Sequence, residues 1–151
     1  MKAEIKWFEY GSTMEDYFMP DNLEQFVELV TMKIGPENFD GGDYFYCHIV
    51  TARFLMDVLK LNQNFNVEWG RHQLIVPYWN QLLIEHEFKT IVSTYGNGDN
   101  WVSIAKKLSN FFQWEFEDYQ VVHSKWGGPI LICPSFTFNS PHTHLVSPRG
   151  F

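Results

Sequence analysis

The sequence has little of what marks a secreted or membrane-bound protein. It holds only two cysteines, Cys47 and Cys133, each within an apolar stretch, so we expect buried free thiols rather than a disulfide. The first residues contain no apolar segment of the kind found in signal peptides. The uncharged apolar runs are far shorter than the ~20 residues that a membrane-spanning helix needs. These absences predict a soluble, cytoplasmic protein without a membrane partner.

Basic residues are also scarce. The chain has 11 lysines and arginines against 18 aspartates and glutamates, which gives a formal net charge of −7. From Glu9 to Asp43, nine acidic residues accompany a single basic one, Lys33. Such a surface repels nucleic acid and favours a basic protein partner. The alternative is that the acidity only keeps the protein soluble.

The common signatures of catalysis are missing as well. The chain has no Gly-x-Ser-x-Gly nucleophile elbow, no phosphate-binding loop and no dinucleotide fingerprint. One enzyme alternative stays open, a small hydrolase that uses Glu115 or Glu117 with His72 or His86. Paired carboxylates are necessary for such acid–base chemistry but are common without it. We therefore expect a protein that is not an enzyme.

Potential metal ligands are grouped only near the C-terminus. A zinc site needs three or four ligands that converge on the ion. The group found here lacks any CxxC or HExxH spacing, so we expect no metal site, no other cofactor and no small-molecule ligand. Its members fall within 22 residues: His123, Cys133, His142 and His144.

Apolar residues make up 45% of the chain and aromatic residues 18%, as is typical of a folded globular protein. Strand patterns precede helix patterns, which favours an α+β fold, with a mainly antiparallel sheet and about three helices packed on one face in a single domain. We predict that residues 1–134 form this domain and that 135–151 form a loosely held tail. The predicted strands are 3–10, 25–34, 44–50, 69–76 and a hairpin of 119–123 with 129–133.

Three helices are predicted between and after these strands. The first follows the third strand directly, from Ala52. The second begins after Asn80, a good helix cap, and ends at Gly96-Asn97-Gly98, where we expect glycine in the left-handed conformation. The third begins after a cap at Asp99. Both later helices have a regular apolar face, with Ile84, Phe88, Ile91, Val92 and Tyr95 on one and Trp101, Ile104, Ala105, Leu108 and Phe111 on the other.

The most unusual segment follows the third predicted helix. Three carboxylates and three large aromatic residues share six positions without a lysine or arginine. The carboxylates could speed the approach of a basic partner, while the aromatic side chains could hold it. If the segment is extended, alternate side chains face opposite ways. We therefore predict a partner-binding surface of Trp114, Glu115, Glu117, Asp118 and Tyr119, with Phe116 between them and Arg71 from a neighbouring strand.

A structural role is the alternative for the same residues. Trp114 and Phe116 could belong to the core, and the acidic residues could pair with Arg71 or Arg53. His72 could in that case form a hydrogen bond within the sheet.

The stretch from roughly Asp21 to Tyr119 resembles the immunity protein 8 family of bacterial polymorphic toxin systems. Four pieces carry the resemblance in order, and the last is the most specific. They are Ile34-Gly35-Pro36, the Cys47-containing run from Tyr46 to Thr51, the Gly70-Arg71-His72 strand, and Asn100-Trp101 opening a helix that leads to Trp114–Tyr119.

The resemblance implies an α+β protein without enzymatic activity that is encoded beside a toxin. Such a protein neutralises its cognate toxin domain, which could be a nuclease, by direct binding. The alternative is a scaffold or a self-associating binding domain that also lacks catalytic activity.

Overall fold

The computed structural model describes residues 1–11, 18–61, 70–117, 120–123 and 129–132 of the 151-residue chain. The chain forms two compact units, Met1–Glu117 and Asp118–Phe151. Of the second unit, the structure describes an antiparallel hairpin of β6 (Gln120–His123) and β7 (Pro129–Ile132), which confirms the predicted hairpin. Cys133 and the boundary predicted after residue 134 lie outside the described residues, so that boundary stays a prediction.

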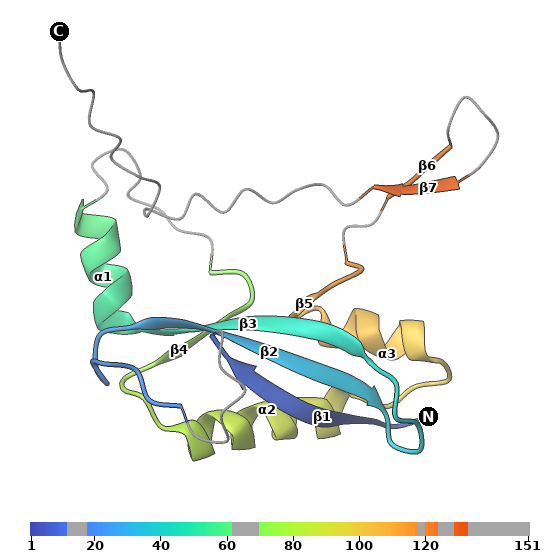
Figure 1. Ribbon diagram of the computed structural model, residues 1–151, viewed down its shortest axis with the longest axis horizontal. Coiled ribbons are helices and arrows are strands. Elements are labelled where there is room, and N and C mark those ends of the chain that lie inside the picture. The colour runs from blue at the N-terminus through green and yellow to red at the C-terminus, as the bar shows by residue number, and fades with distance from the viewer. Residues whose placement is uncertain (12–17, 62–69, 118–119, 124–128, 133–151) are drawn as a thin grey trace, which may run out of the picture. The chain divides into compact units, whose positions relative to one another are not determined.

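The first unit contains a mixed five-stranded sheet (Figure 1). Strands β1 (Ala3–Tyr10), β2 (Val27–Pro36) and β3 (Asp43–Thr51) are antiparallel neighbours. Beside β3 lie two short strands, β4 (Gln73–Val76), parallel to its end, and β5 (Gln113–Trp114), antiparallel to its beginning. Strand β3 therefore lies in the interior of the sheet, with partners on both sides.

Helices α2 (Gln81–Tyr95) and α3 (Trp101–Leu108) cover the face of the sheet that carries the core. Side chains alternate between the two faces of a strand, and the buried ones on β2 and β3 recur at every second position, as in Met32 and Phe45. Phe88 of α2 meets Phe112 edge to face, with ring centroids 5.3 Å apart. These contacts confirm the α+β fold and the apolar faces predicted for the two helices, except at Tyr95, which is 43% exposed and packs against Phe111.

Helix α1 (Ala52–Leu61) continues directly from β3 and contributes no buried side chain. Figure 1 shows that it rises from the end of β3, away from α2. Thr51 marks the junction, because its Oγ1 accepts hydrogen bonds from the N–H groups of Phe26 and Phe54. Two of the three helices thus build the core, and α1 lies at its margin.

Strand β1 forms an edge of the sheet and is irregular at Lys6, where the register with β2 shifts between Ile5 and Trp7. The Lys6 ammonium pairs with Glu4 and donates a hydrogen bond to the carbonyl oxygen of Pro36 at 2.9 Å. Next to the start of β1, the Ala3 N–H donates to the carbonyl oxygen of Gly96 at 2.7 Å. The loop after α2 therefore covers the beginning of this edge.

Two predictions about the helix ends are wrong. Asn100 rather than Asp99 caps α3, with its side-chain oxygen accepting from the Ser103 N–H at 2.9 Å. Gly96 has φ −78°, outside the left-handed region. Glycine is needed there for space, because a Cβ atom would lie 2.3 Å from the carbonyl oxygen of Val92. The predicted cap at Asn80 is confirmed, since its side chain accepts from the Leu83 N–H.

Candidate partner-binding surface

Trp114 begins the aromatic and acidic segment of residues 114–119 and anchors its start to the core. Its ring stacks on Phe45, with centroids 6.4 Å apart, and its indole N–H donates to Asp43 Oδ2 at 2.8 Å. The indole N–H of Trp101 donates to the same oxygen at 2.7 Å. One carboxylate therefore joins the start of β3, the start of α3 and strand β5.

The segment after Trp114 is not extended as predicted. Glu115–Glu117 form a turn, in which the Glu117 N–H donates to the carbonyl oxygen of Trp114 at 3.0 Å. Glu115 closes the pairing of β5 with β3, because its backbone N–H donates to Tyr44 O and its carboxylate accepts from the Tyr44 N–H at 2.8 Å. Glu115 and Glu117 consequently do not share one face of a strand.

Arg71 and His72 lie in a turn before β4, so the strand predicted from residue 69 starts only at Gln73. His72 has φ +55°, a left-handed conformation that side chains other than glycine adopt at a cost. Its Nε2 lies 2.9 Å from the carbonyl oxygen of Ser109 and 3.5 Å from Glu117 Oε2. Arg71 forms an ion pair with Glu117, as the structural alternative for this acid expected.

The segment thus presents less surface than the sequence suggests. Phe116 is 41% exposed and stands edge to face on Trp114, with ring centroids 5.7 Å apart. The Arg71 side chain is 58% exposed, whereas that of Glu117 is 14% exposed. Asp118 and Tyr119 lie outside the described residues. The exposed side chains at this site are therefore Phe116 and Arg71. The residues beside them are held by ion pairs and hydrogen bonds within the protein.

His48 lies on β3 next to this turn, and its backbone N–H donates to the carbonyl oxygen of His72. Burial lowers the pKa of His48, and the neighbouring His72 lowers it further. An unfolded histidine has a pKa of about 6.5. As the pH falls below that value, the unfolded chain binds a proton that the folded His48 resists, so protonation favours unfolding.

We expect the free energy of unfolding to decrease as the pH is lowered from 7.5 to 5.5, and His48→Gln to reduce this dependence. Urea denaturation of both proteins across that range would measure it. Glu28, whose pKa is raised by burial, is present in both proteins, so its contribution cancels in the comparison. Equal pH dependence in the two proteins would show that His48 is not the responsible group.

The described part of the chain allows three further findings. No group of three or more histidine, cysteine, aspartate or glutamate residues in it is placed to hold a metal ion. No helix in it has the length and apolar character to cross a membrane. Cys47 is a buried free thiol, as predicted, and burial raises its pKa to about 12. The side chains of the candidate ligands near the C-terminus lie outside that part: His123, Cys133, His142 and His144.

Comparison with known proteins identifies the family. The model of the family described as immunity protein 8 matches residues 3–119. The chain belongs to the immunity protein 8 family. No curated protein and no solved structure matches it. The match extends beyond the resemblance seen in the sequence, which began near Asp21, and includes β1.

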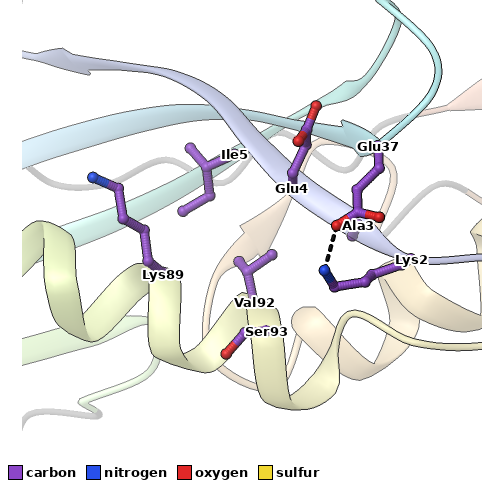
Figure 2. A pocket seen from close by; sticks show the side chains of 8 residues that line it. All are labelled: Lys2, Ala3, Glu4, Ile5, Glu37, Lys89, Val92 and Ser93. Atoms are coloured by element: carbon purple, nitrogen blue, oxygen red, sulfur yellow. Dashed lines mark hydrogen bonds and ion pairs between the residues drawn. The ribbon is translucent and has the colours of Figure 1, made fainter.

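In this member of the immunity protein 8 family, a shallow hollow of about 260 Å³ lies between β1 and α2 (Figure 2). Ala3, Ile5 and Val92 line it with apolar surface. The charged groups around it are paired, Lys2 with Glu37, Glu4 with Lys6, and Lys89 with Glu85. Ser93 donates its hydroxyl hydrogen to the carbonyl oxygen of Thr90. The charges around the hollow therefore balance one another, and the hollow lies at the edge of the sheet.

The structure also shows a surface of this immunity protein that was missed in the sequence. Large apolar side chains are exposed at the start of α2, where Leu82 is 81% and Leu83 58% exposed. The run Leu82-Leu83-Ile84 contains a signal for this surface, because three consecutive helical residues point in different directions around the helix axis and cannot all face the core. Only Ile84 of the three is buried.

Proposed function

We propose that this protein neutralises a cognate bacterial toxin domain in the cytoplasm by direct binding, without catalysis and without a cofactor. The family match over residues 3–119 carries the proposal, because it spans nearly the whole first compact unit. Immunity by binding needs a rigid, complementary surface rather than a catalytic cleft.

A basic toxin, such as a nuclease, suits the charge of this chain. Nucleases bind a polyanion, so their substrate-binding surfaces are commonly basic. The immunity protein carries a net charge of −7, and the Glu9–Asp43 region, with nine acidic residues against one basic residue, accounts for all of that excess. Opposite charges of this kind accelerate association, which benefits an inhibitor that must act before the toxin does.

The segment around Trp114 remains a proposed part of the contact surface, through Phe116 and Arg71. Trp114, Glu115 and Glu117 would support these two side chains, because their own polar groups already serve contacts within the protein. Phe116→Ala tests this assignment, since an unchanged affinity for the toxin would remove Phe116 from the interface.

Inhibition by binding predicts a fixed stoichiometry. In a titration of the purified toxin domain encoded beside this chain, we expect residual toxin activity to fall linearly and to end at a defined molar ratio of the two proteins. An enzyme that inactivates the toxin would act at far lower ratios and with a rate that depends on time. Co-expression should also restore growth of cells that produce the toxin. Failure of the folded protein to bind or to restore growth would contradict the proposal.

A further inference from the structure

Five exposed apolar side chains gather where α2 begins. They come from two segments that are far apart in the sequence, one before β2 and one at the start of the helix. Each is more than two fifths exposed, although large apolar side chains in such numbers are uncommon on one part of a monomer surface. We call them the α2 patch, formed by Met19, Leu23, Tyr78, Leu82 and Leu83.

Hydrogen bonds hold the two segments of the α2 patch together. The Trp79 N–H donates to the carbonyl oxygen of Leu23 at 2.7 Å, which places Leu23 beside Tyr78. The Trp79 indole N–H donates to the carbonyl oxygen of Phe18 at 3.0 Å, and the Phe18 N–H donates to Gln81 Oε1 at 3.0 Å. Met19 follows Phe18 directly, so it lies at the same junction.

Aromatic side chains around the buried Trp79 support the α2 patch. Trp79 is only 6% exposed, and its ring meets those of Tyr10, Phe18 and Phe26 edge to face at centroid distances of 5.2–5.7 Å. The Asn80 cap fixes the first turn of α2 beneath the patch. A surface held this way loses little conformational freedom when a partner binds, so more of the contact energy appears as affinity.

Three exposed carboxylates border the α2 patch. Asp21 lies two residues before Leu23, Glu24 follows Leu23 directly, and Glu87 lies one helical turn after Leu83. Arg53 lies 3.7 Å from Glu24 and offsets one of these charges. Glu28 lies near Asp21, and its pKa is raised by burial and then by the charge of Asp21. The rim therefore carries a negative field.

We propose that the α2 patch is a contact surface for the toxin, and that it fits an apolar side chain flanked by lysine or arginine residues. This inference rests on the proposed function and names the surface and the chemistry of the partner. An apolar centre with a charged rim is the usual anatomy of a protein interface. The acidic rim disfavours two other classes of partner, nucleic acid and an anionic membrane.

Leu82→Glu tests the apolar centre, and Val102→Glu is its matched control. Leu82 and Val102 are each the second residue of their helix, and both are exposed apolar side chains. A carboxylate near a helix N-terminus is favourable, so neither variant should impair folding. We expect Leu82→Glu to weaken binding of the neighbouring toxin domain at least about tenfold. Val102→Glu should bind like the wild type.

The acidic rim is tested with Glu24→Gln and Glu87→Gln combined. We expect this variant to associate with the toxin about threefold or more slowly at low ionic strength, and to lose much of the salt dependence of its association rate. An unchanged rate and salt dependence would overturn the basic chemistry assigned to the partner.

The outcomes separate this inference from the proposed function. If the wild type binds the toxin and Leu82→Glu binds equally well, the α2 patch is not an interface, while immunity by binding stands. If the wild type itself does not bind, the proposed function fails. Light scattering of the wild type and of Leu82→Glu, each without toxin, completes the test. If the wild type is a dimer and Leu82→Glu is a monomer, the α2 patch binds a second copy of this chain, and the inference is overturned.

Discussion

Trp79→Ala is expected to lower the free energy of unfolding by about 4 kcal/mol, because removal of a buried tryptophan leaves a large cavity. Trp79 is in contact with three aromatic rings and donates a hydrogen bond to Phe18. The substitution also releases the two segments of the α2 patch from each other, so toxin affinity should fall with stability. Urea denaturation followed by circular dichroism would measure the first effect, and calorimetric titration the second.

Trp79→Phe provides the comparison. It keeps an aromatic ring in the cluster but loses the indole hydrogen bond to Phe18, a change that should cost about 1–2 kcal/mol. A cost for Trp79→Ala of less than about 1 kcal/mol would show that the aromatic cluster does not organise this end of the molecule.

Asp43→Ala is the second large effect we expect, a loss of about 2–3 kcal/mol in the free energy of unfolding. The substitution leaves the indole N–H groups of Trp101 and Trp114 without their common acceptor, and both lie in partly buried surroundings. Since Trp114 supports Phe116, binding through that surface should weaken as well.

Asp43→Asn separates the acceptor from the charge. Both indoles share a single carboxylate oxygen, so an asparagine carbonyl oxygen at that position can still accept both hydrogen bonds. We expect the asparagine variant to retain most of the stability, losing only the extra strength that a charged acceptor provides. Equal loss in Asp43→Ala and Asp43→Asn would mean that the negative charge, rather than the shared acceptor, matters.

The parts of this fold that were predictable depend on local pattern. Strand β1 has the predicted bounds, and the apolar positions of α2 are buried at Ile84, Phe88 and Val92 as expected. In these elements the side-chain period and the capping residue decide the outcome without help from distant parts of the chain.

The wrong predictions lie where the local sequence fits two structures equally well and contacts with distant residues decide between them. Asp99 and Asn100 are both good caps, and the choice depends on the backbone that leads into α3. The left-handed His72 interrupts a stretch with a strand pattern, in a turn tied to Ser109 and Glu117 across the fold. A sequence window around residues 69–76 contains no sign of either partner.

The candidate site shows the same limit. The pairing of Arg71 with Glu117 was foreseen as one alternative, but the chemistry of the two side chains could not exclude a role in binding. The dependence of Trp101 and Trp114 on Asp43 joins residues 58 and 71 positions apart. Only the run Leu82-Leu83-Ile84 indicated part of the α2 patch in the sequence, because Met19 and Leu23 join Leu82 only in the folded chain.

The irregular edge strand also bears on how the protein behaves when it accumulates. A straight, exposed edge strand can pair with the edge of another molecule and start aggregation. Here the bulge at Lys6 breaks the regular spacing of β1, the lysine side chain is tied to Glu4 and Pro36, and the Gly96 loop covers the first residues. These features act against pairing of β1 with the sheet of another molecule, so we expect this edge not to seed sheet-to-sheet growth.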